Sequence, residues 1–411
     1  MTATTTASSR DGAIIGLVGV AHYFSHLMQL ALPPLFLILH AEFAVSYTEL
    51  GLIVTLFYVA SGVGQAGAGV LVDRFGAPPL LTGGLAAISL GTLLAGLAMS
   101  YWMFLPLAVL AGLGNSVFHP ADLSILSHRV NEKRLGRAFA AHGLTGVLGY
   151  ASSPVVVTSI AAFAGWRAAL IAIGAAGLVV ALLIHLNRRL LDYPGRHAAE
   201  ATAHRAGPRP TYWSVIGSPV IIMAFAYFTL TAFAGNGLQA FGITAFTSGY
   251  GLSMSAATMC LTSFLVANVL GMMAGGFLAE RTERHDYVAM FGIAAGSAFM
   301  LLVTATPAIV AVILPAMGIA GFAYGLTAPS RDVLVRRSAV GVGMGSVFGF
   351  VYSGFDIGSA VAPLLLGAMI DRHLPRVVFL ILAVAFALAA PSVMQFRRPR
   401  TRPAPRLSPA E

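Results

Sequence analysis

The chain is a succession of apolar segments, each long enough to cross a bilayer. A transmembrane helix needs about 20 apolar residues, and twelve such segments can be marked along the 411 residues. Only 9% of the residues are charged, against about 25% in a soluble domain, so most of the surface is expected to face lipid. We predict an all-α membrane protein whose twelve transmembrane helices cover residues 12–40, 47–73, 79–99, 102–128, 137–164, 167–187, 213–246, 253–280, 287–306, 308–334, 343–370 and 375–396.

Lys and Arg residues fall mainly in alternate loops. With a cytoplasmic N-terminus, all of them except Arg167, Arg372 and Arg376 lie on the inner side. This bias predicts that both termini are cytoplasmic. Arg greatly outnumbers Lys, and Ala and Gly are abundant, which is typical of a GC-rich bacterial genome. We therefore expect a multi-pass protein of the bacterial cytoplasmic (inner) membrane.

The segments divide into two groups of six. Residues 1–187 and 213–396 are predicted to form two bundles, joined by a polar cytoplasmic linker at 188–212 and followed by a disordered basic tail at 397–411. The halves also align on each other: a shift of 207 residues pairs Asp73 with Glu280, and a shift of 209 pairs Pro120 with Pro329. Two parallel repeats around a central cavity are a transporter architecture.

A loop signature follows the second segment. It reads Gly69-Val-Leu-Val-Asp73-Arg74-Phe75-Gly76, with a weaker copy from Gly276 to Glu280-Arg281. This resembles the cytoplasmic loop signature of the major facilitator superfamily, although Ala77 and Pro78 replace its usual basic pair. Glycine permits close helix approach, and a carboxylate at a helix end can pair with a neighbouring basic group. We predict conformational or gating roles for Gly69, Asp73, Arg74, Gly76, Gly276, Glu280 and Arg281.

A narrower resemblance concerns the first, fourth and fifth segments. The stretch Gly114-Asn115-Ser116-Val117-Phe118-His119-Pro120, and His22 to Gln29 followed by Pro33, are similar to elements of fosmidomycin-resistance-type transporters. That group is expected to carry an acidic residue near the position of His26, so a shared proton site is not carried over. Gly143, Gly146 and Gly149 form a degenerate glycine-rich antiporter motif, for which plain helix packing is an equal explanation. The resemblance implies a proton-coupled exporter of a drug or small metabolite.

One carboxylate lies near the middle of the eleventh segment. Placing the charge of Asp356 at that depth costs about 3 kcal/mol, so such groups usually face a cavity and have a function. Asp356 is predicted to bind a proton or a cationic substrate. A protonated, structural carboxylate is the alternative.

Other polar groups are candidates for the wall of the cavity. His22 and His26 are four residues apart and share a helix face. They either carry the coupled proton or remain neutral and hydrogen-bonded. His119, Pro120 and Asp122 lie toward the cytoplasm, which favours a gating role over substrate contact. The remaining candidates for the substrate cavity are Gln29, Asn115, Tyr227, Asn236, Gln239 and Tyr352.

The charge of the substrate follows from the same residues. Arg331 and Asp332 are interpreted as an interface charge cluster, which leaves the predicted cavity without a buried arginine. A phosphonate favours fixed positive charge. We therefore expect a neutral, cationic or amphipathic substrate.

These patterns predict a secondary transporter, with proton-coupled export by alternating access as the first hypothesis and proton-coupled uptake as the second. A membrane-embedded metal enzyme with His22 and His26 as ligands is a remote alternative that requires further ligands at the same depth. No nucleotide-binding loop of the form G-x-x-x-x-G-K-[ST] occurs. We expect no enzyme activity, cofactor, metal or nucleic acid. The expected partners are membrane lipid, protons and a small-molecule substrate, with the protein acting as a monomer.

Overall fold

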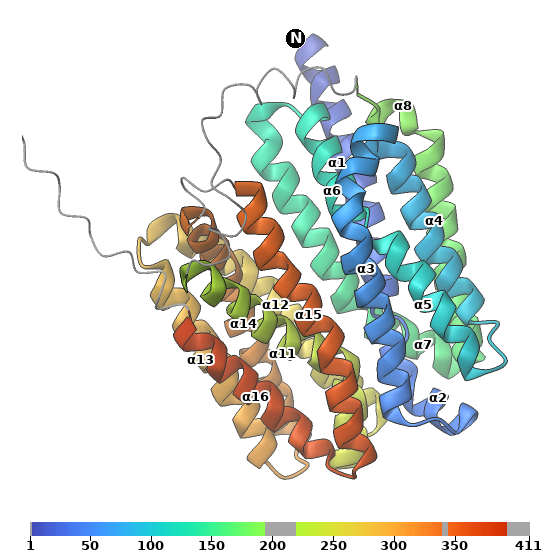
Figure 1. Ribbon diagram of the computed structural model, residues 1–411, viewed down its shortest axis with the longest axis vertical. Helices are drawn as coiled ribbons and strands as arrows, with labels where there is room; N and C mark the ends of the chain where they lie inside the picture. Colours follow the sequence, from blue (N-terminus) through green and yellow to red (C-terminus); the bar gives the residue numbers. More distant parts are fainter. Residues whose placement is uncertain (1, 194–218, 339–343, 393–411) are drawn as a thin grey trace, which may run out of the picture.

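The computed structural model describes residues 2–193, 219–338 and 344–392, and Figure 1 shows that these ranges are helical throughout the two bundles. The prediction of an all-α protein is confirmed. The first group of elements comprises α1 (Thr2–Gln29), a 3-10 turn η1 (Pro33–Leu35), α2 (Phe36–Phe43), α3 (Tyr47–Phe75), α4 (Ala77–Ala95), α5 (Tyr101–Asn115), α6 (Phe118–Arg129), α7 (Glu132–Leu186) and α8 (Arg188–Leu191). The second comprises α11 (Pro219–Tyr250), α12 (Met254–Arg281), α13 (His285–Ala305), α14 (Val310–Ser338), α15 (Met344–Asp371) and α16 (Pro375–Ser392).

Eleven spans in the described residues are long and apolar enough to cross a membrane. One of them is α7, with 55 residues, and its Gly165 has a φ of 84° and a ψ of 161°. A backbone with positive φ leaves the helix and favours glycine. Because α7 therefore contains two helices, the number of crossings agrees with the twelve predicted, with the break where residues 164 and 167 were expected to separate them.

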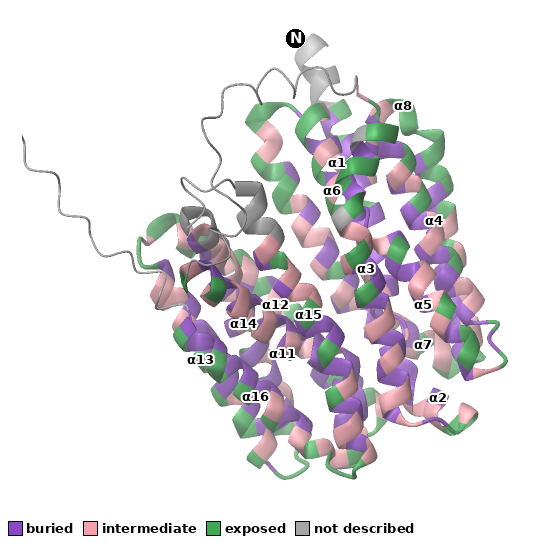
Figure 2. Cartoon of the chain, viewed as in Figure 1, coloured by how far each residue is buried: buried purple, intermediate pink, exposed green. Residues whose placement is uncertain are grey.

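Large apolar side chains cover the outside of the molecule. Phe163 is 94% exposed, Met99 87% and Trp102 71%, and Figure 2 shows exposed and half-buried residues along the outer faces of the helices. Exposure on this scale is costly in water but favourable in hydrocarbon. The protein is therefore a multi-pass membrane protein.

Helices pack mainly within two groups, which lie side by side in Figure 1. In the first group α7 packs on α1 and α4, and α5 on α3 and α4; in the second α11 packs on α15 and α16, and α14 on α12 and α13. The groups meet where α3 contacts α15 and α7 contacts α12. Most of the predicted linker and the whole predicted tail lie outside the described residues.

Hydrogen bonds tie the groups together at the end away from the N-terminus. The Asp371 carboxylate of α15 accepts the backbone N–H groups of Tyr47 (2.8 Å) and Thr48 (2.9 Å) and the hydroxyl of Thr48 (2.6 Å) at the start of α3. Farther along, the Thr55 hydroxyl donates to the Ala360 carbonyl over 2.6 Å. A carboxylate at a helix N-terminus satisfies otherwise unpaired N–H groups and is favoured by the helix dipole. These contacts hold the two groups closed at this end.

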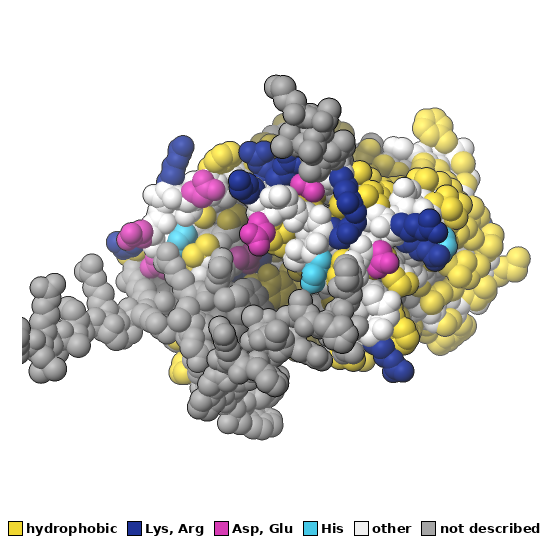
Figure 3. Space-filling view, turned by 90° about the horizontal axis from the view of Figure 1, so that it is seen from above, with side chains coloured by type: hydrophobic (Ala, Val, Ile, Leu, Met, Phe, Trp, Pro, Cys, Tyr) yellow, Lys and Arg dark blue, Asp and Glu magenta, His cyan; other side chains and the backbone are white. Residues whose placement is uncertain are grey.

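Basic side chains collect at the opposite end. Figure 3 looks onto that end and shows several Lys and Arg side chains there. In the described residues, Lys and Arg occur at the ends of α3, α6 and α12, at the start of α7, directly before α13 and on α8. This grouping is what the predicted inner-side loops require. The helix ends carry Arg74, Arg129, Lys133, Arg134, Arg188, Arg189, Arg281 and Arg284.

Candidate functional site

A cavity of about 240 Å³ lies between the two groups of helices. Its wall combines imidazoles, phenols, amides and apolar rings with one guanidinium and one carboxylate. It receives side chains from α1, α3, α5, α6 and α7 on one side and from α11, α14 and α15 on the other. The lining residues are His22, Ser25, His26, Gln29, Tyr58, Ser61, Gln65, Asn115, Phe118, His119, Tyr150, Phe228, Arg331, Tyr352, Phe355 and Asp356.

Asp356 lies at the seam between the halves. It lines the central cavity and also a neighbouring one of about 280 Å³, to which Tyr58 and Gly62 contribute. A Cβ added to Gly62 on α3 would lie 3.3 Å from Asp356 Oδ2. The absence of a side chain at Gly62 therefore leaves room for the carboxylate beside α3.

Arg331 lines the same cavity, and this corrects two expectations from the sequence. Its side chain is 17% exposed, its Nε donates to Asp332 Oδ1 over 2.9 Å, and its guanidinium lies 4.6 Å from the centre of the Phe228 ring. The cavity therefore has a fixed positive charge, and Arg331 is not only part of an interface cluster. Position along a helix did not indicate this, because the long side chain reaches the cavity from the inner end of α14.

Three helices bring histidines and an aspartate together. His142 Nε2 lies 3.0 Å from Asp122 Oδ2, and His22 Nδ1 lies 3.3 Å from the same oxygen. The His22 ring stacks on that of His142 at 3.7 Å and lies 4.4 Å from that of His26 and 5.4 Å from that of His119. We call His22, His119, His142 and Asp122 the histidine cluster. Asp122 and His22 are 0% and 2% exposed.

His119 and Asp122, for which a gating role was predicted, take part in the histidine cluster beside the cavity. Pro120 has no N–H, so the helix is interrupted between α5 and α6, at Ser116 and Val117. His119 lies in the first turn of α6 and lines the cavity, and Asp122 lies behind it. Distance from the expected midplane was a poor guide, because the cavity itself extends toward this end.

Glycines of α7 make space for α1. A Cβ at Gly146 would lie 2.6 Å from His22 Nε2, and one at Gly149 would lie 2.3 Å from the Tyr23 carbonyl oxygen. Contacts this short force a helix or a ring to move. The glycine motif therefore has a packing role here, although a Cβ at Gly143 would meet nothing within 4 Å.

The other cavity candidates divide into two sets. Gln29, Asn115 and Tyr352 line the cavity; Gln29 accepts a hydrogen bond from the Tyr150 hydroxyl, and Asn115 donates to Ser61 over 2.9 Å. The lining of this cavity does not include Tyr227, Asn236 or Gln239, so their assignment to the substrate cavity stays a prediction.

These three side chains bond within the second half instead. The Asn236 amide donates to Ser359 over 2.5 Å, the Gln239 amide donates to Asn236 over 3.3 Å, and the Tyr227 hydroxyl donates to Thr327 over 3.4 Å. Buried polar groups need partners; here α15 supplies that of Asn236, α14 supplies that of Tyr227, and α11 itself supplies that of Gln239.

Two glycines of the loop signature have no close neighbour among the described residues. A Cβ at Gly69 or at Gly276 would meet nothing within 4 Å, so the close approach expected there is absent. Gly76 has a φ of 86° and ends α3, so a glycine is favoured at this position by the backbone conformation alone. Glu280 and Arg281 are exposed, and the side chain of Asp73 lies outside the described residues.

Sequence reasoning missed His142, Tyr58 and Tyr150 as site residues. His142 was recognisable only as a histidine inside an apolar segment, four residues before Gly146. Tyr58 and Tyr150 line the cavity from α3 and α7. Their depth matches that of the predicted candidates, but an isolated tyrosine in a membrane segment gives no sign of the face on which it lies.

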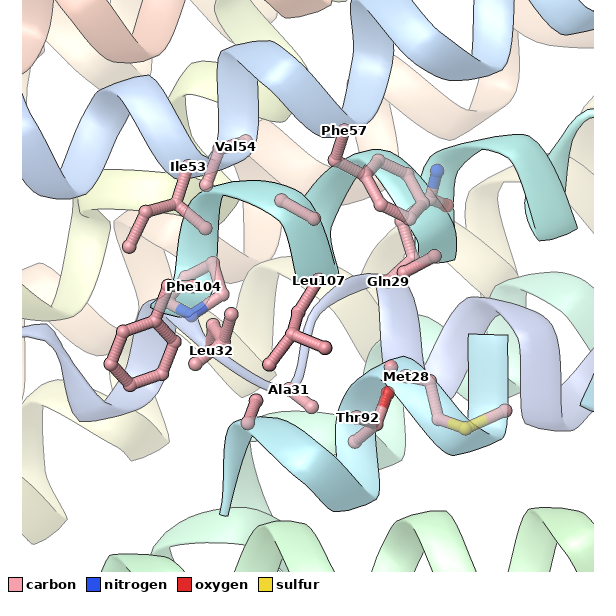
Figure 4. A pocket seen from close by; sticks show the side chains of 15 residues that line it. Met28, Gln29, Ala31, Leu32, Ile53, Val54, Phe57, Thr92, Phe104 and Leu107 are labelled. Carbon is pink, nitrogen blue, oxygen red and sulfur yellow. The ribbon is translucent and has the colours of Figure 1, made fainter. Parts of the chain in front are cut away.

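A smaller cavity lies within the first half. Figure 4 shows its mainly apolar wall, to which Met28, Leu32, Phe57, Phe104 and Leu107 contribute. Its volume is about 40 Å³, and an apolar void of that size is a packing feature. Gln29 belongs to both cavities.

Comparisons with known proteins identify the family. The sequence model of the Major Facilitator Superfamily matches residues 18–339 and 229–411. The fosmidomycin resistance protein of Escherichia coli (strain K12) is 24% identical over 372 residues, covering 88% of each chain.

Two solved structures are similar in fold. One is a bacterial homologue of the human lysosomal transporter Spinster in an inward-facing, occupied conformation, with a TM-score of 0.74, 15% identity and coverage of 94% of this chain and 96% of that one. The other is the nucleoside transporter NupG, with a TM-score of 0.75, 13% identity and coverage of 94% and 100%. The chain belongs to the Major Facilitator Superfamily, a family of membrane transporters rather than enzymes.

Proposed function

We propose that the protein is a proton-coupled antiporter that exports a small drug or metabolite by alternating access. The observation that carries this proposal is that one carboxylate and one guanidinium, those of Asp356 and Arg331, line the same cavity between the halves. The similarity to a fosmidomycin resistance protein supports export. Arg331 also changes the expected substrate, because a guanidinium binds carboxylate and phosphate-like groups in a fixed, two-pronged geometry.

Antiport requires that a proton and the substrate compete. A substrate with an anionic group for Arg331 and a donor group for ionised Asp356 satisfies this requirement. Proton uptake at Asp356 removes the charge that holds the donor group and favours release. A small zwitterionic or amphipathic molecule with one acidic group therefore fits best.

Uptake by symport is the second candidate, and the same pair of residues favours it for a purely anionic substrate. Ionised Asp356 repels such a substrate, whereas the protonated form does not, so proton and anion would bind together. The direction of proton flow during transport distinguishes the two candidates.

The orientation of the protein is part of the proposal. The basic end is assigned to the cytoplasm by the positive-inside rule, which places both termini inside and the closed end, with Asp371, outside. A bacterial cytoplasmic membrane supplies the proton gradient, and one charge crossing 100 mV gains about 2.3 kcal/mol. The protein is proposed to work there as a monomer that opens at either end in turn.

Transport in proteoliposomes under a pH gradient tests the proposal. Wild-type protein is expected to move fosmidomycin or another acidic probe against a counterflow of protons. Asp356→Asn, whose neutral amide mimics the protonated carboxyl, is expected to bind the probe more weakly and to lose the coupling. Glu132→Gln, an exposed acidic residue at the start of α7, is the matched control. Coupling that persists in Asp356→Asn contradicts the proposed role, and co-directional proton flow establishes symport.

A further inference from the structure

The histidine cluster contains more coordinating groups than its hydrogen bonds use. Its three imidazoles come from α1, α6 and α7, and their candidate ligand atoms lie within 4.8 Å of one another. Asp122 adds a carboxylate that approaches two of them through a single oxygen, Oδ2. Histidine and aspartate side chains are usually exposed to solvent, but Asp122 and His22 are buried here.

Two buried polar atoms of the cluster lack a hydrogen-bond partner. They are His22 Nδ1 and Asp122 Oδ1. His22 Nδ1 lies 3.3 Å from Asp122 Oδ2 without the geometry of a hydrogen bond. Buried polar atoms are nearly always paired, and an exception calls for a missing partner such as an ion. Both atoms are possible ligands for a metal ion.

We propose that His22, His119, His142 and Asp122 bind a divalent transition metal ion of the zinc class. Imidazole nitrogen and carboxylate oxygen are preferred ligands of zinc and its neighbours, whereas calcium and magnesium take oxygen ligands almost exclusively. Three histidines with one aspartate supply the four ligands of a tetrahedral site. The proposal goes beyond transport and replaces the expectation, from sequence alone, that no metal binds.

Part of the required geometry is already present. Bonds of about 2.0–2.1 Å in a tetrahedral zinc site place neighbouring ligand atoms about 3.3 Å apart. The separations of 3.0 Å and 3.3 Å between Asp122 Oδ2 and the nitrogens of His142 and His22 match two such edges.

Side-chain rotation completes the site. The stacked rings of His22 and His142 must turn so that their lone pairs converge, and the three imidazoles, whose candidate ligand atoms lie within 4.8 Å of one another, must draw closer together. The His22 ring lies directly against Gly146, where any larger residue would displace it.

The cavity provides a route for the ion. His22 and His119 belong both to the cluster and to the cavity wall, so an ion can reach the ligands through the cavity. Once bound, it would present positive charge to the cavity from the half opposite Arg331. It would also tie α1, α6 and α7 together, which links metal binding to the stability of the first half.

Metal titration of the purified, tag-free full-length protein tests the proposal. After dialysis against a chelator, isothermal titration with Zn²⁺ is expected to show one ion bound per chain. Co²⁺ is expected to give the stronger visible absorption of a four-coordinate ion. His142→Gln and His119→Gln should each weaken Zn²⁺ binding at least about 100-fold, the upper end of the loss caused by removing a supporting residue.

His128→Gln is the matched control. His128 is an exposed histidine in the last turn of α6 that stacks on Tyr193, away from the cluster. The His128→Gln variant should bind Zn²⁺ with the same affinity as wild type. Of the two cluster variants, His119→Gln is expected to disturb folding less, because the His119 side chain faces the cavity. Size-exclusion chromatography and thermal unfolding verify that each variant is folded.

Two results would overturn the proposal. One is wild-type protein that binds no Zn²⁺, in which case the cluster is a hydrogen-bonded buried ion pair only. The other is Zn²⁺ binding that is unchanged in folded His119→Gln and His142→Gln. Neither Zn²⁺-binding measurement requires transport. The metal proposal can therefore fail while the antiport proposal stands, and the reverse.

Discussion

Asp122 and Arg331 occupy matching positions in the two halves but serve the cavity differently. The shift of 209 residues that pairs Pro120 with Pro329 also pairs these two residues. Asp122 is fully buried behind His119 and beside His142, whereas Arg331 lines the cavity and lies over Phe228. One half thus presents imidazoles backed by a carboxylate, and the other presents a fixed cation with aromatic rings. The two halves therefore carry opposite charges, Asp122 and Arg331, at one paired position.

Packing, by contrast, is shared between the halves. Gly149 and Gly358 are paired by the same shift, and each lies against the backbone of the first helix of its own half. A Cβ at Gly149 would lie 2.3 Å from the Tyr23 carbonyl oxygen, and one at Gly358 would lie 2.1 Å from that of Thr229. The two halves therefore share their helix contacts but differ in the charged residue at the paired position. Substitutions at the paired glycines test the first statement, and substitutions at the charged residues test the second.

The largest effect is expected from Arg331→Gln. Loss of the only fixed cation among the lining residues should weaken binding of an acidic substrate by about 100-fold, because a desolvated charged partner is worth about 2–5 kcal/mol. Equilibrium binding of a labelled acidic probe measures this. Arg331→Lys should recover part of the affinity, since the charge remains but the two-pronged geometry does not.

Arg188→Gln serves as the control for that experiment, because Arg188 is exposed on α8. Equal weakening in both variants would show that overall charge, and not the cavity, determines affinity. The asymmetry between the halves would then have no bearing on substrate binding.

A smaller effect is expected from Gly149→Ala and Gly358→Ala. Each added methyl group overpacks a helix contact and should lower the free energy of unfolding by about 1–3 kcal/mol. Chemical unfolding in detergent measures both. Gly143→Ala, where a Cβ meets nothing within 4 Å, should be neutral or slightly stabilising. A penalty at one site alone would argue against shared packing.

The smallest effect is expected from Asp371→Asn. The carboxylate accepts three hydrogen bonds from the start of α3 through both of its oxygens. Asn has a single acceptor oxygen, so at least one of these bonds is lost and those that remain are uncharged and weaker. Opening of the closed end should become about 10-fold more favourable, since a hydrogen bond to a charged group contributes about 1.5–3 kcal/mol and only part of it is lost.

Spin labels on Ala41→Cys and Leu374→Cys, both at exposed positions on opposite halves, would report this opening. Longer label-to-label distances in Asp371→Asn are the expected result. Thr48→Val removes one of the three bonds and should produce a smaller change. Distances unaffected by both substitutions would show that packing of α3 on α15 alone keeps this end closed.

The sequence alone determined the number of helices, their approximate bounds and the relation between the halves. Apolar length and loop charge are local properties, and the membrane makes them decisive because every crossing has to satisfy its own backbone. The break at Gly165 was expected from the sequence, between segments ending at 164 and starting at 167, whereas the segment 102–128 was predicted as one helix and is interrupted before Pro120.

Tertiary structure decided which polar residues share a cavity. Tyr227 and Asn236 lie at suitable depth but bond to other helices of their own half, and Gln239 bonds to Asn236 on its own helix, whereas Arg331 reaches the cavity from a helix end. His142 joins Asp122 and His22 only because α7 lies against α1 and α6. The depth of a residue in the membrane can be counted along its own segment. Whether its side chain points into the cavity depends on how its helix is rotated against its neighbours, and that is determined by contacts along the whole chain.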